Sequence, residues 1–226
     1  MSRKYCDSHM HEVGTQESGF LIALDGAIIG EGYLNNEVQA VAKQNNLIPV
    51  QYVTSELGFN YETKIVKYHP RIEKYTCEEV NQHIRQYSPK AVIIDTLNQP
   101  YWKPDDYWKL AMEHPKTQFL FAHAGGFDIV DFVKIVMFQK NAWIDFSHTQ
   151  HYFGWCAMRN ALPLVVQHID YALKEDRVYN KLLFGLDNTN KIKVDCDAAI
   201  SKYEEFGSCN LVLKDNFYKF LEQSKL

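Results

Sequence analysis

Residues 118–123 have the sequence Gln-Phe-Leu-Phe-Ala-His, an apolar run that ends in a histidine. Residues 91–95 (Ala-Val-Ile-Ile-Asp) and 182–187 (Leu-Leu-Phe-Gly-Leu-Asp) have the same form, with an acid as the last residue. Short continuous apolar runs are typical of strands that are buried on both faces of a parallel sheet. Parallel strands need long crossover connections, so these runs predict a sheet whose strands alternate with helices.

The rest of the chain continues this alternation on both sides of the three runs. We expect strands at residues 5–11, 27–30, 47–54, 63–68, 91–95, 118–123, 142–146 and 182–185. We expect helices at residues 36–44, 77–87, 105–114, 128–139, 163–174, 196–206 and 215–223. This pattern predicts an α/β protein folded as a closed (β/α)8 TIM-type barrel. A length of 226 residues is below the ~250 typical of that fold, so some helices should be short or missing, above all after the first strand.

Composition limits the class of protein further. Hydrophobic residues make up 46% of the chain and charged residues 23%, which excludes a disordered, collagen-like or coiled-coil protein. The net charge of −4 lacks the basic surplus that is typical of nucleic-acid binders. No repeat or Gly/Ser-rich linker divides the chain, so we expect one domain over residues 1–226.

The cysteines and the apolar stretches indicate the cellular compartment. Five cysteines without a CxxC pair argue against a disulfide framework and against a thiolate zinc site. The N-terminal residues 1–11 are polar rather than signal-like, and the apolar stretch 19–30 is too short to span a bilayer. We therefore expect a cytoplasmic protein that acts on a small molecule without a nucleic-acid or membrane partner, and leave homo-oligomer formation open.

The first sign of chemistry is the stretch Asp7-Ser8-His9-Met10-His11. Side chains two residues apart share one face of a strand, so Asp7, His9 and His11 should point the same way. Two imidazoles near the end of a strand supply half of a divalent-metal site. Alone, the pair is better explained as two half-buried structural histidines.

Other expected strands also end in residues that can bind a metal: Asp95, His123 and Asp187. In a parallel barrel the C-terminal ends of all strands gather on one rim, where active sites form. His9, His11, Asp95, His123 and Asp187 should therefore converge as a candidate ligand set, although they span most of the sequence.

Taken in order, these motifs resemble the amidohydrolase superfamily, in particular its amidohydrolase-related branch of hydrolases, lactonases and decarboxylases. The matching segments are DSHMH (7–11), KYHP (67–70), AHAGG (122–126), WIDFS (143–147), LLFGLDN (182–188) and LKDNFYKFL (213–221). The resemblance covers essentially the whole chain.

The resemblance implies a role for each matching residue. His9 and His11 would be metal ligands, and Asp187 would bind the metal and take a proton from its water. His123 would act beside them as acid/base or electrophile. At Asp95 the family usually has a histidine ligand, and three interpretations stay open: Asp95 is an oxygen ligand, His123 fills the gap, or metal affinity has fallen. Lys67 raises the alternative of a carboxylated lysine between two metals, and we favour a single ion.

A bound divalent cation lowers the pKa of water towards ~7, a carboxylate can accept its proton and a histidine can protonate a leaving group. Mixed nitrogen and oxygen ligands suit Zn²⁺, with Mn²⁺ or Fe²⁺ as alternatives. The sequence thus predicts a metal-dependent hydrolase of a small-molecule ester, lactone or amide. Two alternatives remain: a metal-dependent non-oxidative decarboxylase of a small unsaturated acid, and a degraded barrel that acts as a binding protein.

Four further residues are candidates for substrate binding. His69, before Pro70, could contact substrate or serve as a rigid structural histidine. Arg71 could bind a carboxylate or phosphate, although pairing with a surface acid is the more common role. His148 and His151 follow the seventh expected strand in an aromatic-rich segment and could line a pocket, because loops at this rim carry function.

Overall fold

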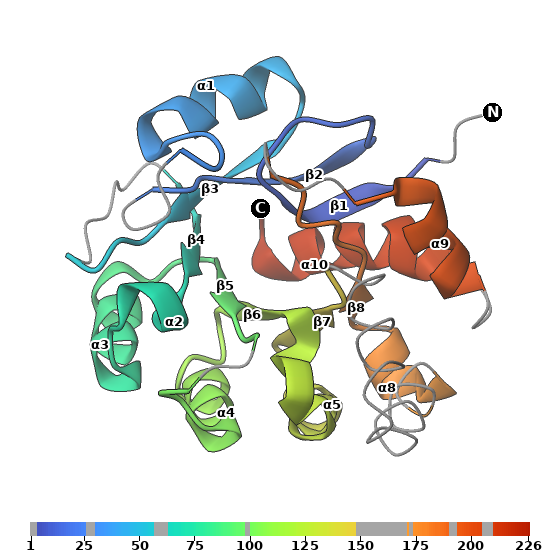
Figure 1. Ribbon diagram of the computed structural model, residues 1–226. Helices are drawn as coiled ribbons and strands as arrows, with labels where there is room; N and C mark the ends of the chain where they lie inside the picture. The colour runs from blue at the N-terminus through green and yellow to red at the C-terminus, as the bar shows by residue number, and fades with distance from the viewer. Residues whose placement is uncertain are drawn as a thin grey trace.

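A computed structural model gives the architecture of the chain. It describes residues 4–25, 30–56, 63–97, 100–147, 171, 174–189, 194–204 and 210–226. Eight parallel strands follow one another around a barrel in chain order, with helices on the outside (Figure 1). The predicted TIM-type barrel is therefore confirmed.

The strands lie close to their expected positions with one exception. Their bounds are β1 Cys6–Met10, β2 Ser18–Ile22, β3 Ile48–Tyr52, β4 Ile65–Tyr68, β5 Ala91–Asp95, β6 Gln118–Ala122, β7 Ala142–Asp145 and β8 Leu182–Leu183. The expectation for the second strand was wrong: it occupies Ser18–Ile22 rather than residues 27–30, of which only Gly30 is described. Gly19 permits this position, because a Cβ there would overlap the Met10 side chain and the Asp7 carbonyl of β1.

Backbone hydrogen bonds join the segment after β8 to β1 and so close the barrel. The Ser8 N–H donates to Phe184 O at 2.8 Å, and the Asp187 N–H donates to His9 O at 2.6 Å. Farther along, the His11 N–H donates to Asn188 O at 2.9 Å. These bonds place the start of the chain beside Asp187, so the two ends of the candidate ligand set become neighbours.

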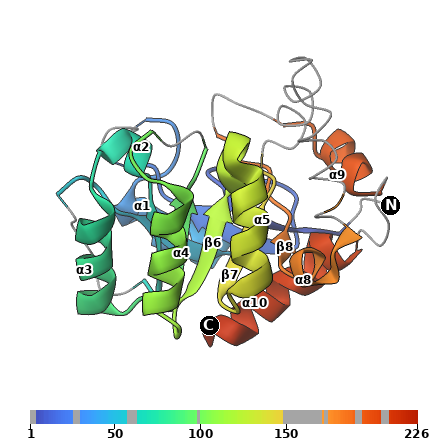
Figure 2. The same cartoon turned by 90° about the horizontal axis from the view of Figure 1, so that it is seen from below.

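The helices form the outer layer, and Figure 2 shows α3, α4 and α5 side by side. The helix bounds are α1 Asn35–Gln44, α2 Pro70–Glu73, α3 Cys77–Tyr87, α4 Pro104–Glu113, α5 Ile129–Phe138, α8 Asp176–Tyr179, α9 Cys196–Glu204 and α10 Asn216–Ser224, with a 3-10 segment η2 at His123–Asp128 and a π-helical segment η3 at Leu211–Asp215. No helix joins β1 to β2, which confirms the abbreviated first connection. Most of the helix expected at 163–174 lies outside the described residues.

Apolar side chains fill the barrel, and α10 closes it at the N-terminal ends of the strands. The rings of Phe217 and Phe220 pack against Phe20 at centroid distances of 4.8 and 5.6 Å. The Asn216 side-chain amide donates to the carbonyl of Leu182, at the start of β8. α10 covers this end of the barrel. The polar side chains of the candidate site lie at the opposite, C-terminal rim.

Among the described residues, none of the helices has both the length and the apolar character needed to cross a membrane.

Candidate metal centre

His9 in β1 and His11 directly after it meet Asp187, which follows β8. Asp187 Oδ1 lies 3.3 Å from His9 Nε2 and 3.1 Å from His11 Nε2. One ligand atom from each residue falls within a group whose members are all within 4.8 Å of one another. Two imidazole nitrogens and a carboxylate oxygen suit Zn²⁺ and related ions, so this donor set fits a divalent cation.

Each histidine of this group is oriented by a hydrogen bond on its other ring nitrogen. His11 Nδ1 lies 2.9 Å from the Ile22 carbonyl, which can only accept, so Nδ1 carries the proton. His9 Nδ1 lies 3.1 Å from Ser147 Oγ and 3.6 Å from Asp145 Oδ2. Such partners on Nδ1 place the lone pair of each ring on Nε2, as in many metal-binding histidines.

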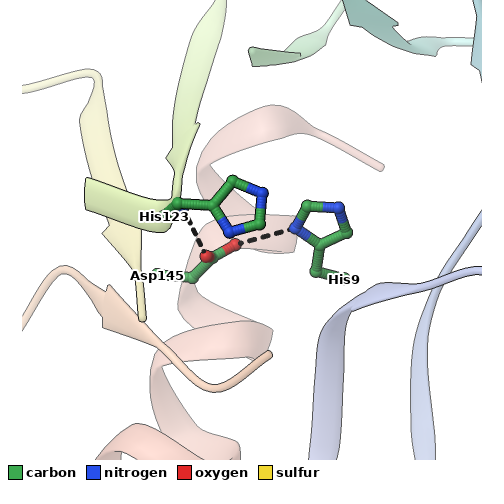
Figure 3. A group of neighbouring side chains, drawn as sticks. All are labelled: His9, His123 and Asp145. Atoms are coloured by element: carbon green, nitrogen blue, oxygen red, sulfur yellow. Dashed lines mark hydrogen bonds and ion pairs between the residues drawn. The ribbon is translucent and has the colours of Figure 1, made fainter. Parts of the chain in front are cut away.

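A second group, His9, His123 and Asp145, lies next to the first (Figure 3). Ser147 Oγ lies between its members, 2.9 Å from His123 Nδ1 and 2.5 Å from Asp145 Oδ1. Asp145 also accepts the His123 backbone N–H at 3.0 Å. Ser147 and Asp145 thus hold His9 and His123 next to the first group.

Asp95 lies beside the cluster and contacts two histidines rather than joining either metal group. Its Oδ2 is 3.2 Å from His123 Nε2 and also 3.2 Å from His69 Nε2. Arg71, 41% exposed at its side chain, approaches Asp95 Oδ1 at 4.0 Å. His123 Nε2 is also 3.7 Å from Asp187 Oδ2, so its ring lies between Asp95 and Asp187.

Burial and charge divide the histidines into neutral and protonated ones. Burial is the main cause that lowers the pKa of His9 to about 4, and it likewise lowers the pKa of His11. Burial opposes the charge on His123, but its hydrogen bond to Asp95 and the nearby acids raise its pKa to about 9. Burial would also raise the pKa of Asp95, yet the neighbouring His69 and His123 hold it well below its usual range. Burial thus favours neutral imidazoles at His9 and His11, the form that can bind a metal, and Asp95 favours the protonated form of His123.

Two site residues hold a left-handed backbone conformation. His123 has a φ of 64° and Asp187 a φ of 57°, and neither is a glycine. Such strain costs roughly 1–3 kcal/mol per residue and is concentrated at functional sites. Here it lies directly after β6 and near the end of β8, where it turns both side chains towards His9.

Lys67 on β4 points into the barrel, towards His9 and His11. Its Nζ lies 2.7 Å from His9 Nε2 and 3.5 Å from His11 Nε2. Burial lowers the pKa of this lysine, and the charges of Asp187, Asp95 and Asp145 oppose that effect.

The sequence prediction missed Asp145 and Ser147 as parts of the site. The seventh strand was expected to end at residue 146, whereas it ends at Asp145. An acid at a strand end was the signal used for Asp95, and it would have identified Asp145 as well. His148 and His151, expected to bind substrate, lie outside the described residues.

Neither a protein-family model nor a curated protein matches this chain. Among solved structures, an uncharacterized TIM-barrel protein from Bordetella bronchiseptica matches with a TM-score of 0.62 at 14% identity, over 93% of this chain and 79% of that one. An amidohydrolase 2 from Bifidobacterium longum subsp. infantis matches with a TM-score of 0.56 at 10% identity, over 98% of this chain and 99% of that one. A probable 2-pyrone-4,6-dicarboxylic acid hydrolase from Acinetobacter baumannii has a TM-score of 0.46 at 15% identity, over 98% and 99%.

These identities are low, so the likeness concerns the fold. One of the proteins that share this fold is named amidohydrolase 2. Fold and site together define a TIM-type barrel with a candidate divalent-metal centre at the C-terminal rim of its strands.

Proposed function

We propose that this protein is a metal-dependent hydrolase that cleaves an ester, lactone or amide bond of a small molecule. The observation that carries the proposal is the convergence of His9 Nε2, His11 Nε2 and Asp187 Oδ1 from opposite ends of the chain. The likeness to a solved amidohydrolase supports the same class of reaction. One divalent ion fits this donor set, with Zn²⁺ as the first choice.

When bound, such a cation would lower the pKa of a coordinated water and supply hydroxide near neutral pH. Asp187 has a second oxygen, Oδ2, that faces His123 and could accept the water proton. His123 Nε2 carries a proton that Asp95 stabilises, and it could pass this proton to the leaving group. His9, His11 and His123 are all buried, which limits the contact of their side chains with bulk water.

The side chains around Asp95 are the candidates for substrate binding. His69 and Arg71 approach it from the start of α2, and Arg71 is partly exposed at the rim. A guanidinium in this position could bind a substrate carboxylate. This feature also favours a second candidate, a non-oxidative decarboxylase, which would release CO₂ from a small unsaturated acid where a hydrolase releases none.

The experiment that tests the proposal combines metal analysis with a substrate panel. After exchange with Zn²⁺, Mn²⁺ or Fe²⁺, the wild-type protein should retain about one ion per chain and hydrolyse at least one ester, lactone or amide. Asp187→Asn should lower the rate by about 10²–10⁴-fold, because it removes the proton acceptor. The matched control is Asp176→Asn, since Asp176 is an exposed aspartate of α8.

Each possible outcome has a defined meaning. Failure to retain any of the three ions would overturn the metal-dependent account. Metal retention with CO₂ release would support the decarboxylase. Retention of metal and of ligand binding in Asp187→Asn, with no turnover by either protein, would favour a binding protein.

A further inference from the structure

The amine of Lys67 lies close to the Nε2 atoms of both candidate ligand histidines. Lys67 is 2% exposed and reaches this position from β4, across the barrel from β1. Its Nζ is at hydrogen-bond distance from His9 Nε2, at 2.7 Å, and 3.5 Å from His11 Nε2. A lysine side chain is thus enclosed within the metal centre itself.

The other hydrogen bonds of the two histidines show that Lys67 contacts the nitrogens whose lone pairs would bind the metal. His11 Nδ1 must donate to the Ile22 carbonyl, which fixes a lone pair on His11 Nε2. For His9, the carboxylate of Asp145 and the hydroxyl of Ser147 face Nδ1, which likewise fixes the lone pair on Nε2.

An imidazole nitrogen has a single in-plane lone pair, which can accept an N–H or bind a cation but not both. A Zn–N bond is about 2.0–2.1 Å long. The Lys67 amine, 2.7 Å from His9 Nε2, contacts the same nitrogen that such a bond would use. The amine carries N–H donors in both of its protonation states, so the competition does not depend on its titration.

We propose that Lys67 is an intramolecular competitor of the metal ion and sets the affinity of the centre. This inference rests on the proposed function, since it takes His9, His11 and Asp187 as the ligands. With Lys67 in place, the amine donates to the histidine nitrogens that would bind the metal. A metal ion binds only to the fraction of molecules in which the flexible lysine has moved away, so its apparent Kd is raised by the inverse of that fraction.

The test is the Kd for Zn²⁺, measured by competition with a chromophoric chelator, of wild type and variants. Lys67→Met removes the amine and keeps the length of the side chain, and we expect it to lower the Kd at least tenfold. Lys67→Gln serves as a second neutral variant in case the methionine impairs folding, which thermal melting would reveal. Lys64→Met is the matched control, because Lys64 is exposed just before β4 and should leave the Kd unchanged.

Other roles for Lys67 predict a different effect of these substitutions on the Kd for Zn²⁺. A higher Kd in Lys67→Met and Lys67→Gln, or loss of a second bound ion, would overturn the competitor role and make Lys67, free or carboxylated, part of the metal site. An unchanged Kd would overturn competition while leaving the metal-dependent function intact. If neither the wild type nor the variants bind Zn²⁺, both the inference and the proposed function fail.

Discussion

The hydroxyl of Ser147 organises the centre at the scale of a single residue. It lies 2.5 Å from Asp145 Oδ1, 3.1 Å from His9 Nδ1 and 2.9 Å from His123 Nδ1. A serine hydroxyl has one proton and two lone pairs, so it can donate to the carboxylate and accept from both imidazoles. All three contacts are therefore satisfied at once, and both histidines carry a proton on Nδ1.

We predict that Ser147→Ala weakens metal binding by about 10–100-fold, the usual cost of removing a partner of a metal-binding histidine. The alanine leaves both Nδ1–H groups without the serine oxygen, so the two rings lose their fixed orientation. Chelator competition measures the affinity, and the ¹⁵N shifts of the histidines report the tautomers. Ser201→Ala, an exposed serine of α9, is the control; equal metal affinity in the two variants would contradict the role of Ser147.

At the scale of elements, the turn after β6 places His123. His123, Ala124, Gly125 and Gly126 all have positive φ, so the chain makes a left-handed turn inside η2 before α5 begins. The Gly125 N–H donates to Thr96 Oγ1 at 2.8 Å, which ties the turn to the end of β5. The His123 side chain thereby faces Asp95.

We predict that Gly125→Ala lowers the free energy of unfolding by about 2–5 kcal/mol, from the positive φ and from overpacking. Its φ is +80°, and a Cβ would overlap the ring of Phe132. Gly30→Ala is the control, because Gly30 has a φ of +89° and, among the described residues other than its chain neighbours, no heavy atom lies within 4 Å of its Cβ position. It should lose only about 1–2 kcal/mol. Urea denaturation measures both, and equal losses would show that the Phe132 contact is unimportant.

The strands also show which parts of the fold can be predicted from sequence patterns. The apolar runs located β5 and β6 within a residue, because burial on both faces leaves a continuous signal. The second strand was misplaced because residues 19–30 hold more than one apolar stretch, and periodicity does not select between them. The pairing of Phe20 with Ile48 of β3 does, and that contact exists only in the folded barrel.

The candidate site could likewise be predicted only in part from the sequence. Period-2 spacing placed His9 and His11 on one face, and the barrel rule brought Asp187 to them. The contacts of Ser147 and of Lys67 with His9 depend on side-chain directions across the barrel. Those directions follow from the register of strands far apart in sequence, which no local pattern specifies.

At the scale of the whole molecule, the two ends of the barrel have different tasks. The C-terminal rim holds the buried polar network, and burying its charged groups costs free energy. The other end is apolar, where α10 inserts Phe217 and Phe220 among the strands. In this fold the bottom face carries stability and the top face carries chemistry, so mutations at the two ends should separate the two properties.

We predict that Phe220→Ala lowers the free energy of unfolding by about 3–5 kcal/mol, the usual cost of emptying a buried aromatic position. Its ring is fully buried, 5.6 Å from the Phe20 ring and 5.4 Å from the Trp143 ring. Tyr218→Ala, on the same helix but 42% exposed, should cost about 1 kcal/mol or less. Below its melting temperature, folded Phe220→Ala should keep the Zn²⁺ affinity of the wild type within about twofold, since distant sites are usually independent. A large loss of affinity without loss of stability would show that α10 acts on the metal centre.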